Sequence, residues 1–309
     1  MQSVKLGMKS IEIGIPNGNY PGLSHYFEHT KLRQHHTCVL ELQDNWGNLL
    51  RNLNGFGPLL TVSTSSSVVS TKIYEEVYFN QLDASVYEID GCHELRPDKI
   101  SSVLVAQEHF DKQILLSIQF YDPKRRGFLK LCLTLQSDLK RFHEWIEESF
   151  ANKSPLKKSK MPVRKLKQKS SYQQDLAAHS KRADSPHSMD VSPICCPLLI
   201  ELAKSQQIPL QFIMLTPAMR HFEVLERFDL NSSKEGFTLE TEGLAISVQT
   251  SNLRRAALHR PVDGPSTPYA LNLYEPCKCF HTVILPALHP SDERVTCWAS
   301  EVEKLFINQ

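Results

Sequence analysis

The sequence predicts an α+β protein, built as an internal duplication of a helix-flanked antiparallel β-sheet unit. The first observation is an alternation of apolar residues over 114–135, interrupted by the polar turn Asp-Pro-Lys-Arg-Arg-Gly at 122–127. A period of two broken by a Pro/Gly turn is typical of a β-hairpin, and we expect one buried face. The second observation is a similar pattern over 269–285, where apolar alternation again meets a turn at Pro276.

The two hairpins align at a constant separation, which predicts the duplication. Phe120-Tyr121-Asp122-Pro123 corresponds to Leu273-Tyr274-Glu275-Pro276, a separation of 153 residues. The same separation brings Trp145 onto Trp298, two of the three Trp residues in the chain. Nearer the N-terminus the separation becomes 151, where 58–75 lies over 209–226 without a gap. A single loop insertion explains that drift, so the chain is a two-unit repeat.

The elements of the first unit follow from local patterns. A short helix is expected after Asp44, with Trp46, Leu49, Leu50 and Leu53 on one face and Asn54-Gly55 as its end. Residues 58–105 are rich in Val, Thr, Tyr and Ile and predict several strands. The hairpin follows, and a helix entered through Ser137-Asp138 closes the unit.

The second unit repeats this order. Its first helix is expected to begin at Pro197, and strands follow from Pro209. The closing helix shows an apolar stripe typical of one packed helix face, formed by Val295, Trp298, Ala299, Val302 and Leu305.

The repeat divides the chain into four parts. We expect an N-terminal extension at 1–43, the first repeat at 44–150, a linker at 151–193 and the second repeat at 194–309. The linker is rich in Lys, Arg, Ser and Gln and poor in large apolar residues, which favours a solvated connector over a contact for nucleic acid or acidic lipid.

Bulk composition excludes several classes of protein. With 309 residues, 41% hydrophobic content and a net charge of +1, the chain has room for two cores and lacks the basic field of a typical nucleic-acid binder. No apolar run reaches the roughly 18 residues of a membrane helix, and no signal-peptide pattern precedes the repeat. The 8 Cys form no regular framework and indicate reduced thiols. We therefore expect a cytoplasmic protein.

Two groups of residues suggest metal ligands without matching a standard spacing. One is the segment with His25, His29, His35, His36 and Cys38. The other is Cys277-x-Cys279-x-His281, which overlaps a predicted turn and has Lys124, Arg126 and Phe128 as its counterpart in the first unit. Ordinary histidines and unpaired thiols are the favoured interpretation of both groups.

Several segments resemble one protein family. They are GPLLTV at 57–62, ELRPDKI at 94–100, SIQFYD at 117–122 and TPYALNLYE at 267–275. Together they are similar to the cytoplasmic haem-utilisation and haemin-degrading proteins of the HemS/ChuX type, over about two-thirds of the chain. Full-length members of that family are themselves duplications of a helix-flanked antiparallel sheet, so the resemblance implies the same two-repeat architecture.

The resemblance implies haem as the ligand, held between the halves by an axial His and a distal Arg. The Arg of the family motif falls on Arg96, whose fixed donor fork suits a distal role, whether in carriage or in catalysis. In the second unit the corresponding residue is Gln249. The segment that carries the axial ligand in the family differs here, and His179 and His187 are its only imidazoles able to bind the iron.

Two classes of function remain open. In the first, the protein binds haem as a carrier and degrades it if oxygen-dependent turnover occurs, with a reductase or haem-uptake components as partners. In the second, it is a non-catalytic duplicated scaffold that has lost haem binding and binds another protein or a small ligand. A homodimer is compatible with both, whereas a hydrolase is disfavoured because no nucleophile elbow, phosphate loop or HExxH motif is present.

Overall fold

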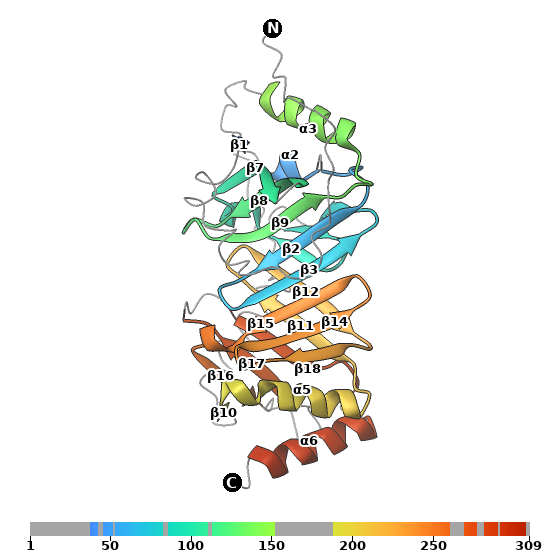
Figure 1. Cartoon of the computed structure of the whole chain (residues 1–309), viewed down its shortest axis with the longest axis vertical. Coiled ribbons are helices and arrows are strands. Elements are labelled where there is room, and N and C mark those ends of the chain that lie inside the picture. The colour runs from blue at the N-terminus through green and yellow to red at the C-terminus, as the bar shows by residue number, and fades with distance from the viewer. Residues whose placement is uncertain are drawn as a thin grey trace.

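The computed structural model describes residues 38–42, 46–51, 53–82, 86–110, 113–151, 188–259, 269–276, 281–289 and 291–306. Within them the chain forms two antiparallel β-sheets, and helices lie at both ends of the long axis (Figure 1). The expected α+β class is therefore confirmed. We refer to the described residues of 38–151 as the first half and to those of 188–306 as the second half.

The first sheet contains nine strands among the described residues, in the order β1-β7-β8-β9-β2-β3-β15-β14-β13. Six strands belong to the first half: β1 (Cys38–Leu42), β7 (Ser102–Phe110), β8 (Gln113–Tyr121), β9 (Gly127–Leu133), β2 (Leu59–Thr64) and β3 (Val68–Tyr74). The other three belong to the second half: β15 (Leu244–Gln249), β14 (Gly236–Thr241) and β13 (Asp229–Ser232).

The second sheet has the same plan with the halves reversed, in the order β10-β16-β17-β18-β11-β12-β6-β5-β4. Its second-half strands are β10 (Ser188–Val191), β16 (Arg255–His259), β17 (Ala270–Tyr274), β18 (His281–Pro286), β11 (Leu210–Leu215) and β12 (Met219–Leu225). Its first-half strands are β6 (His93–Leu95), β5 (Tyr87–Ile89) and β4 (Phe79–Gln81). Each half thus lends three strands to the sheet of the other.

The matching strand orders confirm the internal duplication. Every strand of one half has a counterpart at the same place in the other half, including the exchanged three. The helices also correspond: α2 (Trp46–Arg51) with α5 (Cys196–Ser205), and α3 (Leu139–Ala151) with α6 (Glu293–Phe306). Short 3₁₀ turns, η2 (Pro97–Lys99) and η4 (Thr250–Asn252), occupy equivalent places, and η3 (Pro193–Cys195) precedes α5. The first strands in the two sheet orders, β1 and β10, lie inside the ranges expected as extension and linker.

Strands β8 and β9 form the predicted hairpin, with Ile118 and Phe120 in the core. The expectation of a single buried face was wrong, because the described residues of both strands are buried on both sides. Gln119 is fully buried and Lys130 is 3% exposed, although both alternate with the core residues. Leu135 lies beyond the end of β9 and is exposed, contrary to the predicted alternation.

Both predicted Trp helices are present and pack alike. The indole Nε1 of Trp145 donates to the Leu49 carbonyl at 3.5 Å, and that of Trp298 donates to the Leu199 carbonyl at 3.2 Å. In each half the closing helix is therefore bonded to the first helix through the same atom pair. Leu305, expected in the α6 stripe, is largely exposed in the last turn.

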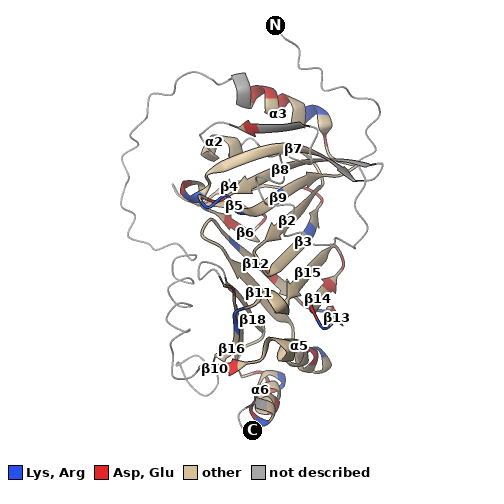
Figure 2. Cartoon of the chain, turned by 60° about the vertical axis from the view of Figure 1, so that its left-hand side comes forward, with Lys and Arg blue, Asp and Glu red and all other residues tan. Residues whose placement is uncertain are grey.

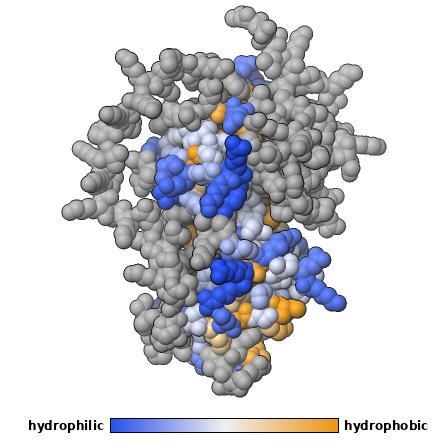
Figure 3. Space-filling view, turned by 90° about the vertical axis from the view of Figure 1, so that its left-hand side faces the viewer, coloured by the Kyte–Doolittle hydropathy of each residue, from blue (hydrophilic) through white to orange (hydrophobic). Residues whose placement is uncertain are grey.

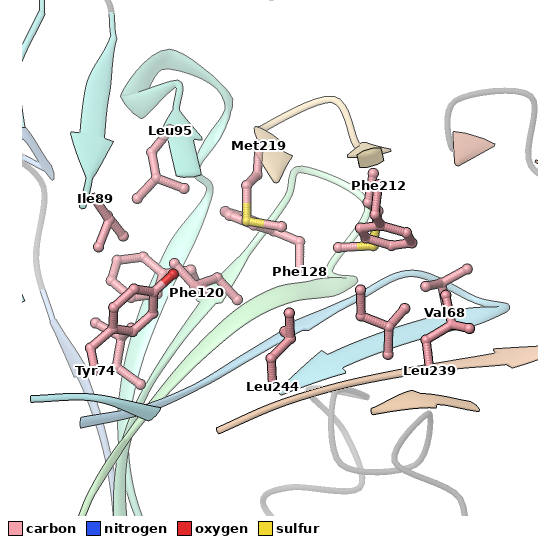
Figure 4. Packing of buried hydrophobic residues seen from close by; sticks show 14 of the residues in the cluster. Val68, Tyr74, Ile89, Leu95, Phe120, Phe128, Phe212, Met219, Leu239 and Leu244 are labelled. Carbon is pink, nitrogen blue, oxygen red and sulfur yellow. The ribbon is translucent and has the colours of Figure 1, made fainter. Parts of the chain in front are cut away.

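A single cluster of buried apolar side chains extends through both halves. Figure 4 shows part of it, where Phe120 and Phe128 of the first half share the cluster with Phe212 and Met219 of the second. We call the side of each sheet that meets this cluster its core face, and the opposite side its outer face. Among the described residues, no helix is both long and apolar enough to cross a membrane.

Candidate functional site

Arg96 is the predicted site residue that lies within the described residues. It follows β6 directly and precedes η2. Its backbone N–H donates to the carbonyl of Ala218 at 2.9 Å, which fixes Arg96 against the turn between β11 and β12. Its guanidinium Nη2 donates to Asp98 Oδ2 at 3.0 Å, and the side chain is 18% exposed. The Arg96 side chain is therefore a positive charge at the boundary between the halves, and hydrogen bonds to its backbone and its guanidinium fix its position.

The register of β6 places Arg96 at the edge of the outer face of the second sheet. Glu94 pairs with Arg220 of β12, and their side chains form an ion pair at 3.4 Å. Arg96 keeps an extended backbone, with φ −110° and ψ 98°, so its side chain points to the same side as that of Glu94. The Arg220 guanidinium also lies over the Phe222 ring at 5.2 Å from its centroid.

The centre of this outer face is apolar. Ile213, Leu215, Ala270 and Val283 form a buried cluster there, with Phe222 and Leu285 packed against it. Asn272 lies in the same region, paired in register with Val283, and is fully buried. Its Nδ2 donates to the Ala270 carbonyl at 3.1 Å, while its Oδ1 has no hydrogen-bond partner among the described residues.

The far edge of the outer face is again basic and aromatic. The Arg255 guanidinium is bonded to Asp190 and lies 5.5 Å from the centroid of the Tyr274 ring.

In the charge-coloured view the strands are mostly uncharged, with Lys, Arg, Asp and Glu mainly on helices and near strand ends (Figure 2). The side of the molecule in Figure 3 is largely hydrophilic where described residues are visible, and hydrophobic residues gather near its lower end.

A second group of functional side chains is buried at the junction between the core faces. Lys72 of β3 donates to both carboxylate oxygens of Glu223 of β12, at 3.0 and 2.9 Å. The two residues are equivalent in the repeat, so this ion pair lies where the two halves meet symmetrically. Lys72 Nζ also lies 3.5 Å from Cys92 Sγ.

Two buried histidines extend the junction group. The rings of His93 and His221 stack with centroids 4.2 Å apart. His93 Nε2 is 2.8 Å from Ser63 Oγ, and His221 Nε2 is 3.2 Å from Glu223 Oε1. Burial lowers the pKa of both imidazoles, and that of His93 falls well below its usual range. Both rings are therefore neutral at pH 7.

The charges of the junction are stabilised by one another. Burial disfavours the charged form of Glu223, but the hydrogen bonds from His221 and Lys72 and the positive charge of Lys72 outweigh it and lower the pKa of the carboxyl. Burial likewise disfavours the Lys72 ammonium, yet Glu223 and Cys92 raise its pKa overall. In contrast, burial raises the pKa of Asp90 to about 6.

The junction group has a structural role, although its hydroxyl and imidazole groups resemble those of a catalytic site. A hydroxyl and an imidazole within hydrogen-bond distance are typical of a nucleophile and its base. Here Ser63 and His93 are both fully buried against the core, so a substrate has no route to the hydroxyl. Sequence patterns did not predict this group, although the 151-residue separation that aligns the halves also aligns Lys72 with Glu223.

The other predicted site residues are not placed by the structure. His179 and His187 lie outside the described residues, as do Cys277, Cys279 and the four N-terminal histidines. The structure therefore does not bring Arg96 together with either histidine. Within the described ranges, no group of three or more His, Cys, Asp or Glu side chains is placed to hold a metal ion.

Comparison with known proteins shows structural but not sequence similarity. No protein-family model and no curated protein sequence matches the chain. The haem-degrading enzyme ChuS of Escherichia coli O157:H7 matches with a TM-score of 0.66 at 11% identity, over 88% of each chain. Holo-PhuS, a haem-binding protein of Pseudomonas aeruginosa, matches with a TM-score of 0.65 at 13% identity, over 85% of this chain and 86% of that one.

A second structure of ChuS, identified there as an E. coli haem oxygenase, gives a TM-score of 0.65 at 13% identity and covers 86% of this chain. The matches extend over both halves and leave little of either protein uncovered. The chain therefore has the duplicated, two-sheet fold of the haem proteins ChuS and PhuS.

Proposed function

We propose that this protein binds haem and carries it, with the outer face of the second sheet, beside Arg96, as the binding surface. The observation that supports this most is the extent of the structural match. Both halves are retained over 88% of the chain and 88% of ChuS, so the chain keeps the complete architecture of a haem protein. Sequence similarity contributes little, since identity is only 11–13%.

The residues of the outer face fit such a ligand. Haem is a flat apolar ring with two carboxylates, which calls for an apolar platform with cations at its margin. The Ile213 cluster is buried in this structure and would supply the platform only when uncovered, and Arg96 and Arg255 lie at its two edges. Asn272 Oδ1 adds a buried acceptor that lacks a hydrogen-bond donor in the part of the chain that the structure describes, as expected for a polar atom that meets a ligand.

The axial ligand follows from the resemblance alone. We propose that His179 or His187 supplies the imidazole and that Arg96 acts on the opposite side of the ring. When bound, haem supplies an iron centre that carries the redox chemistry. The contribution of Arg96 is a permanent positive charge that Asp98 and the Ala218 carbonyl hold in place.

An optical titration with haemin tests the proposal. We expect a saturable one-to-one Soret shift in the wild type, a changed spectrum in either His179→Ala or His187→Ala, and an affinity about tenfold lower in Arg96→Ala, since one contact to a charged group is lost. Gln249→Ala, which changes the equivalent position of the other half, is the matched control and should bind like the wild type.

A spectrum that stays that of free haemin in every protein would refute haem binding. The duplicated fold would then serve as a scaffold for another ligand or protein. If haemin binds, adding a reductant under oxygen distinguishes a carrier from a degrading enzyme: loss of the Soret band with formation of a tetrapyrrole product indicates turnover, whereas a stable reduced spectrum indicates carriage.

A further inference from the structure

Asn272 lies inside the apolar region of the outer face of the second sheet. Its neighbours along β17 on both sides belong to the shared core, so the Asn272 side chain points to the outer face. The register places it beside Val283 of β18 and Ala257 of β16. All three residues are fully buried, and Val283 belongs to the Ile213 cluster. A polar amide is therefore surrounded across the sheet by aliphatic side chains.

One of the two polar atoms of this amide is bonded within the protein. Asn272 Nδ2 donates to the Ala270 carbonyl at 3.1 Å, whereas Oδ1 accepts a hydrogen bond from none of the residues that the structure describes. A buried acceptor without a donor destabilises the folded state. Buried polar atoms are bonded in the great majority of cases, so this exception points to a ligand that supplies the donor.

The first half shows how an amide at this place is satisfied by the protein itself. Gln119, 153 residues before Asn272, occupies the equivalent position and is also fully buried. Its Oε1 accepts from the Tyr121 hydroxyl at 2.8 Å, and its Nε2 donates to the Ser117 hydroxyl at 3.0 Å. Both polar atoms of Gln119 are therefore bonded along one strand.

The residues of the second half change this arrangement. The side chain of Asn272 is one methylene shorter than that of Gln119, and Ala270 occupies the place of Ser117. The fold thus accommodates a fully bonded amide at this position, and the open acceptor is a property of the second half in particular.

We propose that Asn272 selects tetrapyrroles that carry a hydrogen-bond donor near the centre of the ring, and that its Oδ1 accepts from that donor. The inference rests on the proposed haem function and adds the property of the ligand that this face recognises. Asn272 lies among the residues of the apolar platform, whereas Arg96 and Arg255 lie at its margins. A side chain in this place meets the interior of a flat ligand rather than its carboxylates.

Two kinds of tetrapyrrole carry such a donor. In ferric haem the donor is a water bound to the iron on the side of the sheet, and in a ring-opened linear tetrapyrrole it is a pyrrole N–H. Zinc protoporphyrin offers neither, because the metal binds all of its pyrrole nitrogens and takes a single axial ligand, the proposed axial histidine. Since it has the ring and the carboxylates of haem, it isolates the effect of the donor.

Binding titrations with haemin, biliverdin and zinc protoporphyrin test the inference. Asn272→Leu keeps the volume of the side chain and removes the acceptor. We expect the affinity of this variant for haemin, biliverdin or both to fall about tenfold, and that for zinc protoporphyrin to change by less than about twofold. A loss for haemin alone identifies the iron-bound water as the donor, and a loss for biliverdin alone identifies the pyrrole N–H. Equal losses for all three ligands, or no loss for any, would overturn the inference.

Two further variants separate selection from packing. Asn272→Gln combined with Ala270→Ser introduces the bonded pair of the first half, so the amide should be satisfied internally and the preference for a central donor should disappear. Val283→Ala removes apolar contact beside Asn272 and should weaken the binding of all three ligands by the same factor. Circular dichroism of each ligand-free variant checks that it is folded.

The wild type distinguishes this inference from the proposed function. If none of the three ligands binds the wild type, the proposed haem function fails and this inference fails with it. If the ligands bind but Asn272→Leu does not discriminate between them, the proposed function stands and the role of Asn272 is refuted.

Discussion

The Lys72–Glu223 pair is the residue contact on which the junction depends most. Both side chains are largely buried, with exposed fractions of 24% and 6%. Glu223→Gln leaves the Lys72 ammonium without its carboxylate, and we expect the free energy of unfolding to fall by about 3 kcal/mol. Urea unfolding measures the change, with the exposed Glu226→Gln as a control that should differ from the wild type by less than about 0.5 kcal/mol.

The double variant Lys72→Met with Glu223→Met separates charge from packing. Since it leaves no unpaired charge, it should be more stable than Glu223→Gln. A double variant less stable than Glu223→Gln would show that the ion pair itself contributes net stability. The loss of stability in Glu223→Gln would then not be caused by the unpaired Lys72 ammonium.

The stacked histidines predict a loss of stability in mild acid. Burial lowers the pKa of both His93 and His221 in the folded protein, so the unfolded chain binds protons first as the pH falls. The stability that follows from their neutral state is complete above about pH 6.5, the ordinary value for histidine, and is lost progressively below it. Glu223, whose folded pKa is lowered, adds a further loss below about pH 4.5.

Urea unfolding between pH 7.5 and 5 measures this effect. Comparison with a His93→Gln, His221→Gln variant isolates the junction from the exposed histidines. The wild type should lose stability more steeply than the variant over this range, and parallel pH profiles would contradict the assignment.

At the scale of elements, the two Trp helices provide an internal comparison. Trp145→Phe and Trp298→Phe each remove an indole donor from a buried contact with the first helix of the same half. We expect each to reduce the free energy of unfolding by about 1–3 kcal/mol, because the Leu49 or Leu199 carbonyl loses its partner and a small cavity forms. Denaturant unfolding followed by circular dichroism checks both, and a neutral effect in one half alone would show that the halves are packed differently.

Local sequence patterns predicted the helices and strands better than they predicted which faces of those elements are buried. Alternation and a Pro/Gly turn are properties of the hairpin itself, so β8 and β9 were predictable from the chain. Burial of Gln119 and Lys130 was not, because polar residues that alternate with apolar ones are also the pattern of a solvent-facing strand. Whether an outer face is buried depends on distant segments of the chain, so the local hydrophobic periodicity of a strand does not predict it.

The sequence pattern also did not predict the exchange of strands between the two sheets. β4, β5 and β6 read as ordinary short strands of the first repeat, yet they complete the sheet of the second. Arg96 was predictable because it lies in a family-like motif, whereas no sequence pattern marks His93, three residues earlier, as functional. Its role depends on stacking against His221, which only the paired register of β6 and β12 brings close.

At the scale of the whole molecule, strand exchange predicts that neither half folds alone. Residues 1–151 expressed separately retain β6 without β12 and β3 without β15, which leaves two sheet edges and much of the shared core open. We expect each half to aggregate or stay disordered by circular dichroism. Mixing it with residues 188–309 should restore a 1:1 complex by size-exclusion chromatography, and a monomeric, cooperatively unfolding single half would contradict this.

The pairing of Lys72 with Glu223 also constrains the history of the chain. In a symmetric dimer of two identical units, a position on the twofold axis meets its own copy, so lysine would face lysine or glutamate would face glutamate. Opposite charges at that position require two units that differ, which a gene encoding a single unit does not provide. This contact therefore arose after the two copies had diverged in sequence, and it makes the halves no longer interchangeable.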